Sequence, residues 1–166
     1  MGDDLIAGLV ERYGTRGVFV DTNILLLYFV GSFDRMMVSR FKRTRQFDGD
    51  DFDLLVSLLG HFETIVTTPN VLSEVNSLSG QIGEPARTRY FGEFSRRIVT
   101  LDEHYVASSD AAQTPHFPRL GLTDAAIMLL SKGSYLVLTD DYVLHGFLEH
   151  QGVDVLNFND LRASLL

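Results

Sequence analysis

The sequence predicts an α/β domain of three layers, with helices on both faces of a central parallel β-sheet. Short apolar runs typical of buried strands alternate with longer segments of helical period. The chain has 166 residues, which suits one domain, and 45% of them are hydrophobic, which is enough for one core. We find no internal repeat and no low-complexity segment. We therefore expect a single domain over residues 1–166, with its core at about 17–158.

The first half of the chain contains two predicted strands with helical segments after each. Thr68 is placed to cap one of these helices, because Pro69 suits the first helical turn. The basic segment at 35–47 is predicted to form a helix or helix fragments. In chain order, the elements are a strand at 17–21, a helix at 23–31, helical segments at 35–47 and 50–62, a strand at 63–69 and a helix at 69–80.

The second half of the chain repeats the alternation and completes the sheet. One segment is polar and contains two prolines, so a loop around a short helix is expected there. The repeated strand–helix order favours a parallel sheet. The elements are an amphipathic segment at 84–98, the polar loop at 107–121, a helix at 122–133, a strand at 134–140, a helix at 141–152 and a strand at 153–158.

Composition excludes several kinds of site. The chain has no cysteine, so disulfides and thiol catalysis are excluded, and any metal ligand must be oxygen or nitrogen. The net charge of −8 counts against simple electrostatic binding of nucleic acid, but not against a nuclease whose metal ions supply the positive charge. No apolar run has the roughly 18 residues of a membrane span, and the first residues lack the basic start of a secretory signal. We expect a cytoplasmic protein without a membrane partner.

Acidic residues stand where predicted strands end and helices begin. Asp21 ends the first strand, and Asp140 and Asp141 end the penultimate one. Asp124 begins a helix, and Glu74 lies one turn into its helix, at the border of an apolar stripe. Ligands of parallel sheets bind at the carboxyl ends of the strands, so these acids are expected to converge. A cation, and Mg²⁺ or Mn²⁺ above all, would neutralise such a cluster of oxygen ligands.

A structural role is the alternative for each single acid. Aspartate is a common helix N-cap and suits the helix dipole, which explains Asp124, Asp140 or Asp141. It explains Asp21 less well, because neighbouring residues can cap instead. Glu74 is too far into its helix to be a cap, although a solvated helix face accounts for it. The joint pattern is therefore more informative than any one residue.

Four motifs in this order resemble the PIN-domain ribonucleases: VFVDTNILL, TTPNVLSEV, LGLTDAAIML and YLVLTDDYVL. The resemblance covers about residues 17–158, and it rests on the four motifs together. It implies a three-layer α/β fold, an acidic pocket and metal-dependent hydrolysis of RNA phosphodiester bonds by an endoribonuclease. Some members, such as the VapC-type toxins, act in toxin–antitoxin pairs and others stand alone, so a toxin role with an antitoxin partner is one option. Family members often form homodimers, so the resemblance also implies a homodimer. Those toxins are usually shorter than this chain between the first and second acids.

The resemblance also implies a role for each acid. Its four catalytic and metal-binding positions match Asp21, Glu74, Asp124 and Asp141. They would hold one or two Mg²⁺ or Mn²⁺ ions, with the fourth acid completing the ligand shell or orienting the water.

Supporting positions follow from the same motifs. In the D-T-N form, Thr22 and Asn23 would support the first carboxylate. The T-x-D pattern places Thr139 before the fourth acid, and Asp140, which is adjacent to that acid, can serve in its place.

The basic segment 35–47 has two readings. Its side chains can hold an RNA backbone through phosphate contacts, or they can form a solvated face. The residues expected to contact RNA are Arg40, Lys42, Arg43 and Arg45.

Three other functions were weighed against the nuclease. A haloacid-dehalogenase phosphatase needs a second acid two residues after the first, where this chain has Asn23. A receiver domain needs a lysine at the end of a later strand, whereas Lys132 precedes its strand. A PIN-like module that binds RNA or protein with little nuclease activity is the remaining alternative.

Overall fold

Five short parallel strands form the centre of the fold in the computed structural model, which describes residues 3–164. Their order across the sheet is β3-β2-β1-β4-β5, and every neighbouring pair is parallel. The parallel sheet predicted from the sequence is therefore confirmed. The strands are β1 (Val18–Val20), β2 (Ile65–Thr67), β3 (Asp102–Glu103), β4 (Leu136–Thr139) and β5 (Val155–Asn157).

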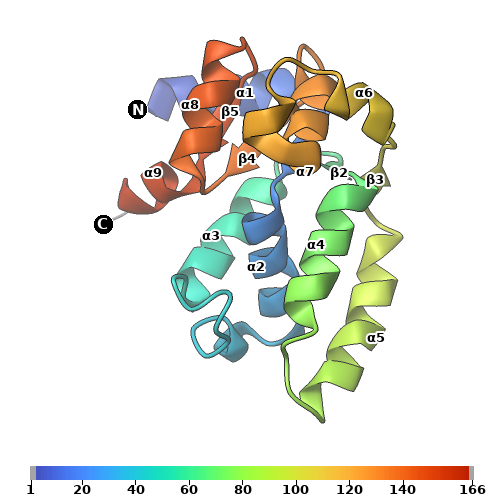
Figure 1. Cartoon of the computed structure of the whole chain (residues 1–166). Coiled ribbons are helices and arrows are strands. Elements are labelled where there is room, and N and C mark those ends of the chain that lie inside the picture. Colours follow the sequence, from blue (N-terminus) through green and yellow to red (C-terminus); the bar gives the residue numbers. More distant parts are fainter. Residues whose placement is uncertain (1–2, 165–166) are drawn as a thin grey trace.

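Helices cover both faces of this sheet, as the three-layer prediction requires. In Figure 1, helices α1, α6, α7 and α8 lie above the strands and helices α2 to α5 lie below them. No helix in residues 3–164 has both the length and the apolar character needed to cross a membrane. The helices are α1 (Asp3–Tyr13), α2 (Thr22–Phe33), the 3₁₀ helix η1 (Arg35–Met37), α3 (Gly49–Leu59), α4 (Pro69–Ser79), α5 (Ala86–Ile98), α6 (Ser108–Ala112), α7 (Phe117–Ser131), α8 (Tyr142–His150) and α9 (Phe158–Ala163).

The core is built around β1 and the helix that follows it. All three residues of β1 are buried, as expected for a central strand covered on both faces. Helix α2 is apolar on nearly every side because it packs against α3, α4 and α5 as well as β4. A rigid strand and a buried helix therefore meet at Asp21, the residue between them.

The sheet has a topological switch point beside β1. The chain leaves β1 to form β2 and β3 on one side, and returns to place β4 on the other side of β1. The connections after β1 and β4 consequently diverge and leave a crevice at the carboxyl edge, where ligands of open α/β sheets bind. Asp21 follows β1 and Asp140 follows β4, so both lie at this point.

Several elements differ from the sequence predictions. The 35–47 segment contains only η1 followed by turns. Strand β3 has two residues, and a strand this short leaves no readable alternation. The predicted helix at 122–133 corresponds to the second part of α7, which is interrupted at Gly121 by a positive φ of 78°. The ends of the predicted domain, residues 1–2 and 165–166, lie outside the described residues.

Candidate active site

Asp21 is held at the carboxyl end of β1 by two neutral hydrogen-bond donors. It is the N-cap of α2, and only 8% of its surface is exposed. The backbone N–H of Thr22 donates to Oδ1 at 2.7 Å, and the hydroxyl of Thr139 donates to Oδ2 at 2.7 Å. Burial raises the pKa of Asp21 to about 6, against the lowering effect of these two hydrogen bonds. The neighbouring carboxylates of Asp140 and Asp141 also raise this pKa.

Glu74 reaches the crevice from helix α4. The hydroxyl of Thr22 donates to its Oε2 at 2.9 Å, and the hydroxyl of Thr123 donates to its Oε1. Glu74 is an exposed residue, as the solvated-face alternative expects, but its side chain also joins α4 to α2 and α7. Thr22 supports two acids, one through its backbone and the other through its hydroxyl. The sequence motif predicted only the support of Asp21.

Asp124 faces the same crevice from helix α7. Burial, and after it the charges of Asp21, Glu74 and Asp141, raise the pKa of Asp124 to about 7. Among the described residues, no hydrogen bond to its carboxylate is found. Asp124 is therefore near enough to Asp21, Glu74 and Asp141 for their charges to raise its pKa. Asp124 lies in the first turn after the break at Gly121 and accepts no backbone hydrogen bond there among the described residues, so it suits the helix dipole without acting as a cap.

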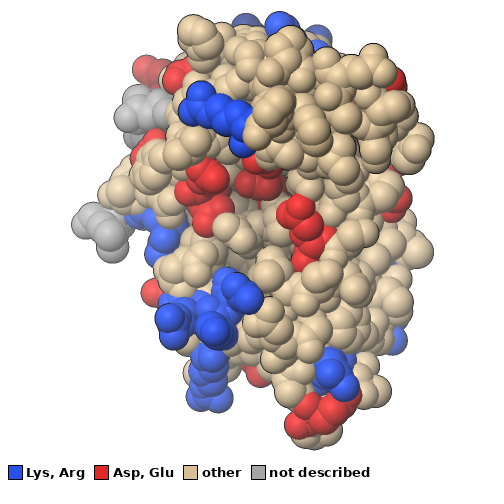
Figure 2. All heavy atoms as spheres, in the orientation of Figure 1, with Lys and Arg blue, Asp and Glu red and all other residues tan. Residues whose placement is uncertain are grey.

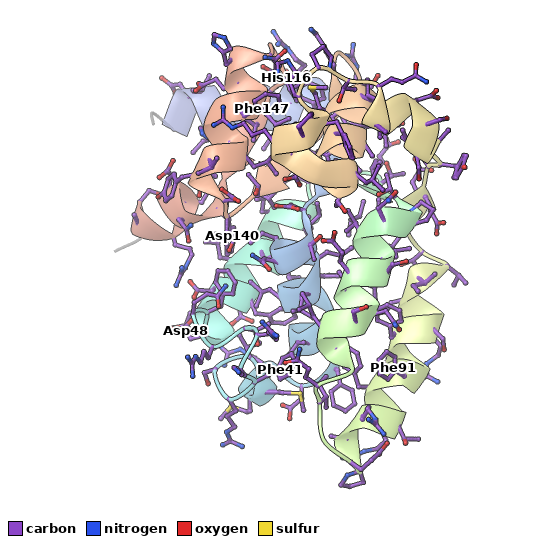
Figure 3. The ribbon with its side chains drawn as sticks, viewed as in Figure 1. Phe41, Asp48, Phe91, His116, Asp140 and Phe147 are labelled. Atoms are coloured by element: carbon purple, nitrogen blue, oxygen red, sulfur yellow. The ribbon has the colours of Figure 1, made fainter. Side chains whose placement is uncertain are left out.

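Asp140 and Asp141 have different structural roles. Asp141 is the N-cap of α8, and its Oδ1 accepts from the backbone N–H groups of Val143 at 2.7 Å and Leu144 at 3.1 Å. Asp140 lies where α7 and α8 face the lower helices (Figure 3), and its buried Oδ1 has no partner among the described residues. Burial raises the pKa of Asp140, while the Asn23 side chain lowers it. Asn23 thus supports Asp140, whereas the motif predicted support of Asp21.

We expect the two adjacent acids to respond differently to substitution. Asp141→Ala removes a helix cap and should lower the free energy of unfolding by about 1 kcal/mol. Asp140→Asn removes a repelled carboxylate and should leave that energy unchanged or raise it. Urea denaturation at pH 8 in EDTA measures both effects. Asp48→Ala, which removes the side-chain cap of α3, is the matched control for cap loss. A loss for Asp140→Asn as large as for Asp141→Ala would contradict this assignment.

Among the described residues, no Lys, Arg or His forms an ion pair with an acid of the site. Within residues 3–164, every ion pair joins residues outside this group of five carboxylates. Figure 2 shows acidic side chains gathered in a hollow at the middle of this face. The acids of the site are Asp21, Glu74, Asp124, Asp140 and Asp141.

The donor set fits a hard divalent cation, although the carboxylates do not form a finished cage. In the described part of the chain, no three acidic or histidine side chains stand close enough together to ligate one ion as placed. All available ligands are oxygens, which suit Mg²⁺ or Mn²⁺. A bound cation would stabilise two groups most: Oδ1 of Asp140, which has no hydrogen-bond partner among the described residues, and the carboxylate of Asp124, whose pKa is raised by burial and by neighbouring charges.

The four basic residues predicted to contact RNA are all exposed, and they lie on the turns after η1. Figure 2 shows basic side chains gathered below the acidic hollow, over the segment that Figure 1 places at the lower left. Within residues 3–164, Arg40, Lys42, Arg43 and Arg45 form no ion pair, although Arg43 donates to Gln81 at 2.9 Å. These positive charges are therefore available to an anionic partner.

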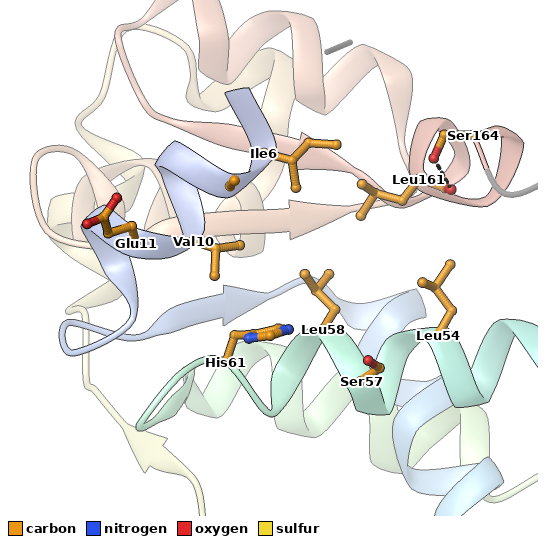
Figure 4. Close-up of a pocket in the computed structure, with 10 residues that line it drawn as sticks. Ile6, Val10, Glu11, Leu54, Ser57, Leu58, His61, Leu161 and Ser164 are labelled. Carbon is orange, nitrogen blue, oxygen red and sulfur yellow. Dashed lines mark hydrogen bonds between the residues drawn. The ribbon is translucent and has the colours of Figure 1, made fainter. Parts of the chain in front are cut away.

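A separate apolar cavity lies away from the acids (Figure 4). It has a volume of about 490 Å³ and separates α1 from α3. Ile6, Val10, Leu54 and Leu58 line it, together with Leu161 of α9. None of the five acids contributes to this cavity, so it is not part of the candidate active site.

Comparison of the chain with models of protein families, with curated proteins and with solved structures gives no match.

Two residues of the site were missed by sequence reasoning. Thr123 was not singled out, although its hydroxyl donates to Glu74 and it directly precedes Asp124. That adjacency in the LTD motif was the available signal. Gln46, whose side chain lowers the pKa of Asp140, comes from the irregular segment before α3, and no sequence pattern marks it.

Proposed function

We propose that this protein is a metal-dependent endoribonuclease related to the PIN-domain ribonucleases. The observation that supports this best is the group of five carboxylates at the switch point of the sheet. Two of them have pKa values raised to about 6 and about 7, and no Lys or Arg of residues 3–164 is paired with any of them. Such an arrangement costs stability unless a cation is bound, and perturbed carboxylates in a crevice are typical of catalytic sites.

Each acid has a distinct part in this proposal. Asp21, Glu74 and Asp124 would hold Mg²⁺ or Mn²⁺, and the threonine hydroxyls fix the direction of two of these carboxylates. Asp140 would help orient the attacking water, while Asp141 caps the start of α8 and adds negative charge. When bound, the ion would activate that water and neutralise the charge that develops on the phosphate.

The exposed basic residues would hold the RNA on the enzyme. Phosphate contacts from Arg and Lys position a nucleic acid without reading its sequence. The segment of Arg40 to Arg45 lies beside the acidic hollow, which suits a backbone that continues past the cleaved bond. The antitoxin partner, the homodimer and the cytoplasmic location stay predictions.

The test is cleavage of a mixed panel of labelled RNAs by the purified protein. We expect cleavage in Mn²⁺ or Mg²⁺, none in EDTA, and a loss of at least about 100-fold in Asp124→Asn. Asp124→Asn is well suited because the substitution breaks no hydrogen bond among the described residues and preserves the side-chain shape. Asp4→Asn, an exposed acid on α1, makes the same change in net charge and should keep full activity.

The outcomes separate the proposal from its alternatives. Cleavage that survives in Asp124→Asn would show a contaminating nuclease or a different site. Binding of Mn²⁺ without cleavage of any RNA would instead favour a PIN-like binding module.

A further inference from the structure

A groove adjoins the acidic crevice on the side away from the basic segment. It has a volume of about 610 Å³ and lies between the start of α4, the segment after β3 and the broken helix α7. Glu74 and Thr123, which are hydrogen-bonded to each other, form part of its wall. The groove and the crevice therefore share a carboxylate. The lining residues that matter here are Asn70, Ser73, Glu74, Tyr105, Leu122 and Thr123.

Tyr105 gives this groove an aromatic wall. Its surface is 80% exposed, so the ring contributes little to the core. The segment that carries it is fixed, because the backbone N–H of His104 donates to the carbonyl of Thr67 at the end of β2 at 2.9 Å. Leu122 adds a second exposed apolar side chain, 38% accessible, directly after the break at Gly121. An exposed aromatic ring on a backbone anchored to β2, beside a groove, is a stacking surface without an occupant within the described chain.

The α4 wall of the groove is polar. The side chains of Asn70 and Ser73 form no hydrogen bond within residues 3–164, so their donors and acceptors are available. A flat ring with polar edges fits between such a wall and an aromatic face, and nucleobases have this chemistry. Because Glu74 lines both the groove and the crevice, a base in the groove would belong to a nucleotide near a phosphate in the crevice.

The charges around the site give the path of the strand. The largest group of basic side chains on this face lies below the acids, and a further basic side chain borders them from above (Figure 2), whereas the groove is bounded by α4, α7 and the segment before α6. A strand held by its phosphates at the basic segment would cross the acids and then enter a groove without positive residues among those that line it. The groove is therefore suited to a base and not to a phosphate group.

We propose that this groove binds one unstacked nucleobase, that of the nucleotide next to the cleaved phosphate, by stacking it on Tyr105. This inference rests on the proposed ribonuclease function. Its consequence is that the substrate must be single-stranded at that nucleotide, because a paired base cannot enter the groove.

The test compares Tyr105→Ala, Tyr105→Phe and Tyr142→Ala. Cleavage of a single-stranded RNA is measured in Mn²⁺, and binding of the same labelled RNA is measured by fluorescence anisotropy in Ca²⁺. We expect Tyr105→Ala to weaken binding and to lower kcat/KM by about 10-fold, mainly through KM. Tyr105→Phe retains the ring and should retain both values. Tyr142, 58% exposed on α8 and outside the groove, is the control and should tolerate alanine.

An RNA with an abasic nucleotide identifies the bound base. Placed next to the cleavage position, the abasic nucleotide should weaken wild-type binding about 10-fold and remove the difference between wild type and Tyr105→Ala. Cleavage that Tyr105→Ala leaves unchanged would contradict base binding in the groove but not the proposed nuclease activity. Binding that depends on Tyr105 without any cleavage would support the groove and contradict the nuclease. Absence of both binding and cleavage would overturn both.

Discussion

The substitution Asp21→Asn is expected to abolish RNA cleavage while making the metal-free protein more stable. In the proposed nuclease Asp21 would be a metal ligand, so its loss should lower kcat/KM by at least about 100-fold. The asparagine oxygen can still accept from the N–H of Thr22, and the Thr139 hydroxyl can turn to accept from the new amide. Removal of the charge ends the cost of burying it, and the smaller repulsion from Asp140 and Asp141, which together raise the pKa of Asp21 to about 6; the free energy of unfolding should rise on the order of 2 kcal/mol above pH 7.

Opposite signs for activity and stability are the diagnostic result. Cleavage assays in Mn²⁺ and urea denaturation in EDTA measure the two quantities on the same preparation. Asp4→Asn should change neither, because that residue is exposed on α1. Destabilisation of Asp21→Asn in EDTA would show that the carboxylate is structural, and retained cleavage would remove Asp21 from the site.

The stability of the metal-free protein should fall as the pH rises from about 4 to about 7.5. The folded protein holds protons on Asp21 and Asp124 up to pKa values of about 6 and 7, whereas the unfolded chain releases them near 4. In this window the folded state binds more protons than the unfolded state, so the free energy of unfolding decreases with pH. These two groups together should account for a decrease on the order of 2–4 kcal/mol.

Divalent ions should reverse this trend, because they bind the deprotonated carboxylates. Thermal melts between pH 4.5 and 8 should therefore show stabilisation by Mn²⁺ that grows with pH. The double variant Asp21→Asn/Asp124→Asn removes both groups, so in EDTA its slope should be flatter than that of wild type. Equal slopes would mean that neither carboxylate titrates abnormally in the folded protein.

The parallel sheet could be predicted because its strands are marked locally. The apolar runs at β1 and β4 are short, buried on both faces and followed by acids, and each feature is visible in the sequence. Strand β3 could not be predicted, because its two residues, Asp102 and Glu103, join the sheet edge only through pairing with β2. Helix α1 lies before the first recognised motif. The hydrogen bond from the Tyr13 hydroxyl to Asp154 could not be predicted, because it joins segments far apart in the sequence.

The positions of the acids were easier to predict than their partners. A parallel sheet brings residues after β1 and β4 to one edge, so the meeting of Asp21 with Asp140 and Asp141 follows from topology. The donation from Thr123 to Glu74 depends on how α7 packs against α4, which no local pattern encodes. The division of labour between Asp140 and Asp141 depends on the exact residue at which α8 begins, and helix ends are the least predictable feature of a sequence.

The neutral partners of the acids have a kinetic consequence. Threonine hydroxyls and backbone N–H groups aim Asp21 and Glu74 without cancelling their charge. Such a crevice repels phosphate at close range until a cation enters it. For the proposed nuclease, assembly would therefore be ordered, with the ion arriving before the RNA backbone can descend. RNA that meets the ion-free protein would remain at the basic segment, bound but out of reach of the acids.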